Sequence, residues 1–434
     1  MRYRLTIHAA LDAPRALESL YREALAHGDA EEFRDDLDAA YAAAPDSRLL
    51  EAWHWRLTQP TPDVGDRRAV NWRLVLPLSA LTALVLWWLS GSDFAFHDLK
   101  GRTIPVLLLL ATPVVALSAL AFVTASRGQA FALTAALGTA LAAVAVLAVW
   151  RAVGDDTYRQ IAITHMPILA WTAVGIAVMG VRSAPRARFA FLAKSIEAIV
   201  VTGVYALGAM VFAMISLQMF RTLGITPPDA VNRLLAVGGV GLMPLIAIAS
   251  VYDLAQPPEG QDFRRGLSRM VSLLPRLLLV LTLLVLVVYV AMIPANFLQP
   301  FRDRDVLITY NVMLFAVVGM LVGATPVTAG DLPDRQQRWL RRGIVAVAAL
   351  VLLVGLYALA AVLYRTVLDR LTLNRLIIIG WDVINIVLLG LLLVRQRKAA
   401  SDAWIASLHA TFSTACAAYA VWAAFAMIVA VWMF

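Results

Sequence analysis

The sequence predicts an all-α fold, a polytopic bundle of transmembrane helices with a small soluble helical domain at its N-terminus. Of the 434 residues, 61% are hydrophobic and only 15% are charged, whereas a soluble domain carries roughly 25% charged residues. Apolar blocks such as residues 277–293 and 344–363 approach the ~20 residues that cross a ~30 Å hydrocarbon layer. These observations exclude an ordinary water-soluble enzyme, a disordered chain and an outer-membrane barrel.

Residues 1–62 form the predicted cytoplasmic helical domain. They hold eleven Asp or Glu and seven Arg, in a chain whose net charge is +8. Asp12, Asp29 and Asp46 each stand where the N-cap of a helix is expected, and Glu32 follows Asp29 at the spacing of a capping box. We therefore expect three short amphipathic helices.

Two tryptophans of this domain need a partner surface. A bundle of three short helices lies near the lower size limit for independent folding. We therefore expect Trp53 and Trp55 to pack on each other, on the membrane domain or on a partner protein. Residues 63–71 are the expected linker, and residues 72–434 are the expected transmembrane helical domain.

The lengths of the apolar segments, and the charged residues that separate them, predict about eleven membrane spans in the second domain. Their expected limits are 72–90, 103–123, 130–150, 161–181, 191–219, 231–252, 270–295, 305–326, 342–364, 375–394 and 403–432. With the N-terminus inside, the predicted cytoplasmic loops hold fifteen Lys or Arg and the opposite loops hold eleven. Because positive flanks resist translocation, we expect a cytoplasmic N-terminus and a periplasmic C-terminus.

The usual signals of soluble enzymes are absent from the sequence. There is no P-loop, HExxH, GxSxG, dinucleotide fingerprint or paired CxxC, and Cys416 is the only cysteine. His165 and His409, the histidines near the membrane, are too isolated to make a metal site. We expect no cofactor, no metal and no nucleic acid, since most of the basic charge flanks the membrane. An enzymatic role is disfavoured but left open.

Polar groups inside apolar spans are the candidate site, because they are costly at that depth. Asp382 and Asn385 lie one turn apart on one face of the tenth span and form a polar stripe. This stripe could coordinate a cation, hydrogen-bond a substrate or join two helices. Glu197, which shares a face of the fifth span with Tyr205, could be a proton or cation site. A structural pair between Glu197 and Lys194 or a neighbouring arginine is the favoured alternative.

The segment 364–389, which reads YRTVLDRLTLNRLIIIGWDVINIVLL, resembles part of an uncharacterised bacterial family of inner-membrane proteins, domain of unknown function 4153. In that family a short loop similar to YGLT..R leads into a late transmembrane helix. Here Leu371, Thr372 and Arg375 match L, T and R, while Arg370 replaces the glycine. The resemblance implies a place in the bacterial inner membrane, with Thr372 and Arg375 as motif positions, and it brings no established activity.

Three functions are compatible with these features. The first is a permease-like protein in the lipid bilayer that binds or moves a small solute or ion along a path lined by Asp382, Asn385, Glu197 and Tyr205. The alternative is a non-transporting scaffold or signalling component that binds a cytoplasmic protein partner through residues 1–62. The third is an intramembrane enzyme acting on a lipid-linked substrate, which would require a lipid-sized groove beside the arginine-rich loops.

Overall fold

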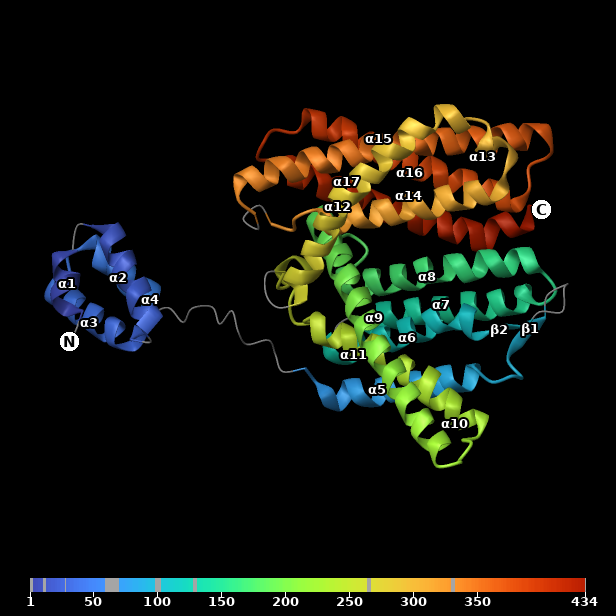
Figure 1. The fold of residues 1–434 in the computed structure, drawn as a ribbon. Helices are drawn as coiled ribbons and strands as arrows, with labels where there is room; N and C mark the ends of the chain where they lie inside the picture. Colours follow the sequence, from blue (N-terminus) through green and yellow to red (C-terminus); the bar gives the residue numbers. More distant parts are fainter. Residues whose placement is uncertain are drawn as a thin grey trace. The chain divides into compact units, whose positions relative to one another are not determined.

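The predicted all-α fold class is confirmed, and a single short hairpin is the exception within the described part of the chain (Figure 1). The computed structural model describes residues 3–10, 13–27, 29–58, 70–97, 103–127, 131–263, 267–328 and 332–433. The chain divides into two compact units, Met1–Ala69 and Val70–Phe434. Residues 59–69, with most of the expected linker, lie outside the described residues, so the linker limits of 63–71 stay a prediction.

The described residues of the N-terminal unit form four helices, one more than the sequence predicted. They are α1 (Arg4–Ala9), α2 (Pro14–His27), α3 (Ala30–Ala43) and α4 (Arg48–Thr58). The additional helix is α1, which is only six residues long and therefore too short to show an amphipathic period. It adds Ile7 to an apolar core in which Leu17, Phe33 and Leu50 are also buried.

The helix starts differ from the expected capping pattern. Asp29 occupies the N-cap position of α3 without a side-chain cap hydrogen bond, and its carboxylate instead accepts from the Tyr3 hydroxyl at 3.3 Å. Helix α4 begins after Ser47 rather than Asp46, because the Ser47 hydroxyl accepts the hydrogen bond from the Leu50 amide at 3.4 Å. Asp12 lies outside the described residues.

The two tryptophans of the N-terminal unit have different environments, since Trp53 is buried and Trp55 is exposed. Trp53 is 5% exposed and packs inside its own unit, with its ring 5.5 Å from that of Tyr21 and 6.4 Å from that of Phe33. The expectation that Trp53 needs an outside surface is wrong, because Tyr21 of α2 and Phe33 of α3 cover its ring. Trp55 is 55% exposed, and its ring centroid lies 5.6 Å from that of the neighbouring His54.

The second unit is a bundle of long apolar helices. They are α5 (Trp72–Leu89), α6 (Leu107–Arg127), α7 (Phe131–Ala152), α8 (Asp156–Met179), α9 (Pro185–Thr222), α10 (Asp229–Arg233) continuing through a π-turn into α11 (Gly239–Val251), α12 (Leu267–Met292), α13 (Gln299–Arg302), α14 (Arg304–Ala324), α15 (Asp334–Leu368), α16 (Leu373–Lys398) and α17 (Trp404–Ala424). Among the described residues, ten helices are long and apolar enough to cross a membrane, counting α10 and α11 as one. The apolar stretch of α14, Thr309–Ala324, is shorter. Ten spans are thus supported, and the eleventh stays a prediction.

The hairpin lies between α5 and α6. Strands β1 (Ala95–His97) and β2 (Thr103–Pro105) are antiparallel, with Phe96 opposite Ile104. The span expected to begin at residue 103 therefore begins at Leu107. The β-branched side chains of Thr103 and Ile104 favour an extended strand over a helix start.

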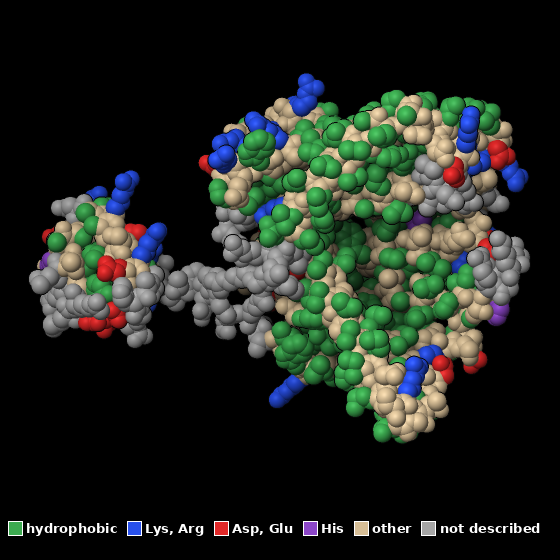
Figure 2. All heavy atoms as spheres, in the orientation of Figure 1, with side chains coloured by type: hydrophobic (Ala, Val, Ile, Leu, Met, Phe, Trp, Pro, Cys, Tyr) green, Lys and Arg blue, Asp and Glu red, His purple; other side chains and the backbone are tan. Residues whose placement is uncertain are grey.

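The long helices form two groups in the second unit (Figure 1). Helices α5 to α8 and α11 pack in one group, and α12 and α14 to α16 pack in the other. Two helices join the groups, since α9 packs against both α11 and α17, and α17 packs against α8, α9 and α16. Figure 2 shows that hydrophobic side chains cover much of the visible surface while charged side chains gather mainly near the helix ends. This is the surface of a multi-pass membrane protein, which contacts the lipid bilayer.

Candidate functional site

Asp382 lies deep in the apolar part of α16. It comes nine residues after the first helical residue, Leu373, which places it about 14 Å from the start of the helix at 1.5 Å per residue. The apolar residues 376–379 precede it, and 383–394 follow it with Asn385 as the one polar interruption. Asp382 and Asn385 are both 0% exposed. A carboxyl group and an amide are therefore enclosed by protein at hydrocarbon depth.

The two residues of this stripe have different surroundings. The Asn385 Oδ1 atom accepts a hydrogen bond from the Tyr419 hydroxyl, so Asn385 joins α16 to α17. Its Nδ2 atom has no hydrogen-bond partner within the described ranges. Both carboxyl oxygens of Asp382 are likewise without a partner in the described structure. The helix-joining interpretation thus describes Asn385, whereas Asp382 makes no polar contact that would hold a neighbouring helix.

Trp381, the residue before Asp382, connects α16 to α8. Its Nε1–H donates to the Nε2 atom of His165 at 2.9 Å. Because an indole nitrogen can only donate, His165 Nε2 must accept, and the proton resides on Nδ1, which lies 2.8 Å from the Ile161 carbonyl oxygen. His165 is therefore neutral in this arrangement. The sequence gives His165 no part in a metal site. It could not indicate the hydrogen bond to Trp381 either, because the two residues are 216 positions apart.

Aromatic rings enclose this part of α16. The rings of Phe315 and Tyr419 lie 5.1 Å and 5.2 Å from that of Trp381. On another side of the helix, Trp422 of α17 lies against the bare backbone of Gly380, where an added Cβ would come within 1.8 Å of the indole Cζ2 atom. The Trp422 Nε1 atom is buried and has no hydrogen-bond partner in the described part of the chain. Only glycine at position 380 allows the indole this close approach.

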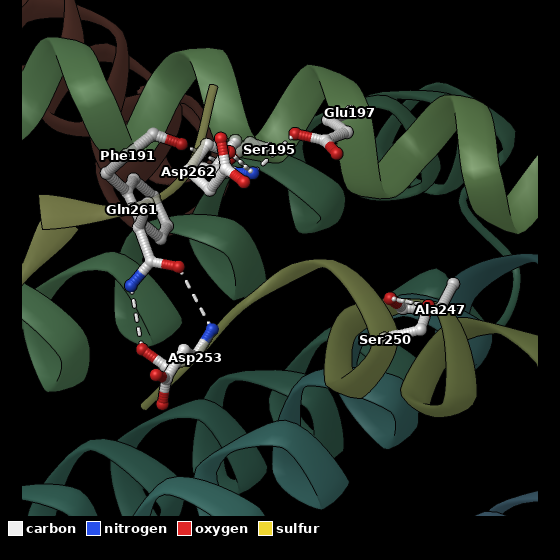
Figure 3. A network of polar contacts seen from close by, with 9 residues as sticks. Phe191, Ser195, Glu197, Ala247, Ser250, Asp253, Gln261 and Asp262 are labelled. Carbon is white, nitrogen blue, oxygen red and sulfur yellow. Dashed lines mark hydrogen bonds and ion pairs between the residues drawn. The ribbon is translucent and has the colours of Figure 1, made fainter. Parts of the chain in front are cut away.

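Glu197 forms a buried ion pair. Lys194, one turn earlier on α9, donates from Nζ to Glu197 Oε2 at 2.7 Å and to the Asp262 carbonyl oxygen at 2.6 Å. Both charged side chains are buried, and the Lys194 Nζ atom also lies 4.9 Å from the Phe263 ring centroid. Figure 3 shows this cluster, with Glu197 on α9 and Asp262 on the adjoining loop. The favoured alternative, a structural pair with Lys194, agrees with this geometry.

The loop between α11 and α12 is held against the helices by side chains that mimic backbone pairing. The Gln261 amide accepts from the Asp253 N–H at 2.9 Å and donates to the Asp253 carbonyl oxygen at 2.7 Å (Figure 3). Arg127, at the end of α6, donates to the carbonyl oxygens of Leu254 at 2.9 Å and Val178 at 2.6 Å. No sequence motif pointed to Gln261 or Arg127, because their partners are backbone atoms.

The four predicted site residues fall into two separate clusters. Tyr205 is half-buried and packs with Val201 of α9 and with α11, on the same helix as Glu197. Asp382 and Asn385 lie on α16, and within the described residues no hydrogen bond or ion pair joins them to Glu197 or Tyr205. The structure therefore shows no polar path through all four residues.

The two family-motif residues organise the start of α16. Thr372 is the N-cap, and its hydroxyl accepts from the Arg375 amide at 3.4 Å. The Arg375 guanidinium forms an ion pair with Asp369 at 3.0 Å and donates to the Arg370 carbonyl oxygen at 2.5 Å. A Thr and an Arg three residues apart, nine and six residues before Trp381, thus begin the helix and fix the preceding loop.

Comparisons with known proteins add nothing to this geometry. No protein-family model, curated protein or solved structure matches the chain. In the described ranges, no group of three or more His, Cys, Asp or Glu side chains could hold a metal ion. The chemistry available at Asp382 is therefore that of one buried carboxyl group, one helical turn from the Asn385 amide and next in sequence to Trp381, which packs on Phe315 and Tyr419.

Proposed function

We propose that this multi-pass membrane protein is permease-like and binds a small solute or ion at Asp382 in order to move it across the bilayer. The observation that carries the proposal is the carboxyl group itself, which is 0% exposed and has no hydrogen-bond partner among the residues that the structure describes. Burying a polar group without a partner costs about 1–3 kcal/mol by mutational measurements. A residue that destabilises the fold in this way suits a binding role better than a packing role.

The residues around Asp382 support a binding site near the centre of the apolar layer. The Tyr419 hydroxyl occupies Asn385 Oδ1 and so fixes the orientation of the amide, which leaves Nδ2 available to a ligand. Midplane sites of this kind are common in transporters, where helices of two structural groups meet. Here the hydrogen bond between Trp381 and His165 links the two groups of helices beside Asp382.

We extend the proposal to location and family. The excess of Lys and Arg in alternate loops supports a cytoplasmic N-terminus and a periplasmic C-terminus in a bacterial inner membrane. Thr372 and Arg375, which begin α16 as a capping unit, support a relationship to the family called domain of unknown function 4153. Fusing a reporter to each terminus tests the orientation, and a C-terminal reporter active in the cytoplasm would contradict it.

The test of transport uses full-length protein in proteoliposomes on a solid-supported membrane. Jumps in the concentration of H⁺, Na⁺, K⁺ and a panel of small charged solutes are applied, and transient currents are recorded. We expect a current for at least one of them in the wild type, its loss in Asp382→Asn and its retention in Glu197→Gln. Asparagine keeps the size of the side chain, so gel filtration should show the same folded species. Equal currents in wild type and Asp382→Asn, or none in the wild type, would refute the proposal.

A second candidate is a membrane scaffold whose N-terminal unit binds a cytoplasmic protein. One observation favours it, since Trp55 is 55% exposed on a unit whose core is already complete without it. Deleting residues 1–62 would then abolish the cellular phenotype of the protein, whereas Asp382→Asn would be harmless. The opposite pattern would exclude the scaffold and favour transport.

A further inference from the structure

Building on the proposed function, we infer that the ion bound at Asp382 is a proton, held as the neutral carboxylic acid, and not a metal cation. Three features of the site lead to this conclusion: the absence of a compensating positive charge, the shortage of oxygen ligands, and the contrast with the paired carboxylate of Glu197.

No positive charge balances Asp382 among the described residues, and the other charged residues of α16 lie near its ends, at Arg375 and from Arg395 onwards. The His165 imidazole beyond Trp381 is neutral, because Nε2 accepts from the indole and Nδ1 faces a carbonyl oxygen. The helices packed against α16 carry Tyr310 of α14, Tyr357 of α15, and Cys416 and Tyr419 of α17, which are uncharged at neutral pH. The arginines of α15 lie towards its two ends, and His409 of α17 contacts the Pro326 carbonyl oxygen; none of them hydrogen-bonds Asp382 in the described structure. An ionised Asp382 would thus be an isolated charge in an apolar medium, which is strongly unfavourable.

The site also lacks the oxygen ligands that a dehydrated metal cation requires. Hard cations such as Mg²⁺ and Ca²⁺ take roughly six or more oxygen ligands, and Asp382 supplies two. Asn385 Oδ1, one turn further along α16, already accepts from the Tyr419 hydroxyl. Asn385 Nδ2 and Trp422 Nε1, which lack partners in the described structure, are N–H donors and repel a cation. The other unpartnered side-chain oxygens of these two helices, Gln396 Oε1 and Ser407 Oγ, lie at the end of α16 and the start of α17. A proton needs only one carboxyl oxygen.

Glu197 provides the contrast within the same chain. Its Oε2 atom lies 2.7 Å from Lys194 Nζ, so its negative charge is compensated. Both carboxyl groups are buried, and they differ in whether a cation is present. Glu197 is therefore the internal control for any measurement that distinguishes a protonated carboxyl from an ionised one.

The test is labelling of full-length protein in proteoliposomes with dicyclohexylcarbodiimide, which reacts with protonated carboxyl groups in apolar surroundings. Mass spectrometry of the digested protein locates the adduct. We expect labelling at Asp382 and not at Glu197, falling about tenfold per pH unit once the acid ionises. An excess of NaCl, LiCl or KCl, replacing choline chloride at constant pH, should not protect Asp382. Protection by any of these salts would overturn the inference in favour of a metal cation.

Infrared difference spectroscopy removes the dependence on access of the reagent. The wild type should show a carboxylic acid C=O band that is absent from Asp382→Asn and retained in Glu197→Gln. Absence of that band in the wild type at neutral pH would overturn the inference. The two proposals fail separately: a protonated Asp382 without any current refutes transport alone, whereas a Na⁺-driven current that is lost in Asp382→Asn refutes the proton alone.

Discussion

Replacing Gly380 with alanine should destabilise the contact between α16 and α17. The new Cβ would lie 1.8 Å from Cζ2, 2.2 Å from Cε2 and 2.4 Å from Cη2 of Trp422, which all belong to one rigid ring. Ordinary contact begins at 3.4 Å, so the ring must retreat by 3.4 − 1.8 = 1.6 Å. Overpacking of this kind costs about 1–3 kcal/mol. Losing the stacking of Trp422 on Phe425, now at 4.9 Å, adds about 0.5–1.5 kcal/mol.

The helix preference of alanine over glycine offsets about 1 kcal/mol of this cost, so a net loss of about 2 kcal/mol is expected. The assay is thermal unfolding in detergent with a thiol-reactive fluorescent maleimide, because Cys416 on α17 is the only cysteine. Gly390→Ala on the same helix is the matched control, since nothing lies within 4 Å of its added Cβ. We expect Gly390→Ala to melt at or above the wild-type temperature. If Gly380→Ala did the same, the packing of Trp422 on Gly380 would be refuted.

Three further predictions concern single contacts. The hydrogen bond from Arg56 lowers the pKa of the Glu18 carboxyl, so this pair stabilises the N-terminal unit above the unfolded-state pKa and is lost as the pH falls through the folded-state pKa. Hydrogen exchange in α2 and α4 should therefore rise on acidification in the wild type and lose this step in Glu18→Gln; an unchanged profile would contradict the pairing. Trp53→Ala should cost the N-terminal unit about 3–5 kcal/mol and the exposed Trp55→Ala less than about 0.5 kcal/mol, which limited proteolysis of the full chain can compare. Trp381→Phe removes the donor to the α8 histidine and should cost about 0.6–1.7 kcal/mol, whereas an unaltered melting temperature would argue against that bond.

Local patterns in the sequence predicted much of the fold. Runs of apolar residues located the membrane helices because their length is set by the bilayer. The three-residue spacing of Lys194 and Glu197 indicated their pairing, since such residues are neighbours on a helix surface. The depth of Asp382 followed from the apolar residues on both sides of it.

Contacts between distant segments were beyond a single sequence. Nothing in the spacing of residues connects Trp381 to His165, or Asn385 to Tyr419, because helix order in a bundle is decided by packing. The unpartnered state of Asp382 depends on every helix around it. The β1–β2 hairpin and α1 were missed because each is only a few residues long.

Helix α9 has a mechanical consequence. Its 38 residues correspond to about 57 Å of helix, nearly twice the ~30 Å hydrocarbon layer. In Figure 1 it runs obliquely past the other helices, and it packs against α11 of one group and α17 of the other. Helix α9 therefore connects the two groups of helices. A rotation of α9 by roughly 10° about its midpoint would displace each of its ends by about 5 Å. If the two groups of helices moved apart, the tilt of α9 would change first. Spin labels at the two ends of α9 could follow this change.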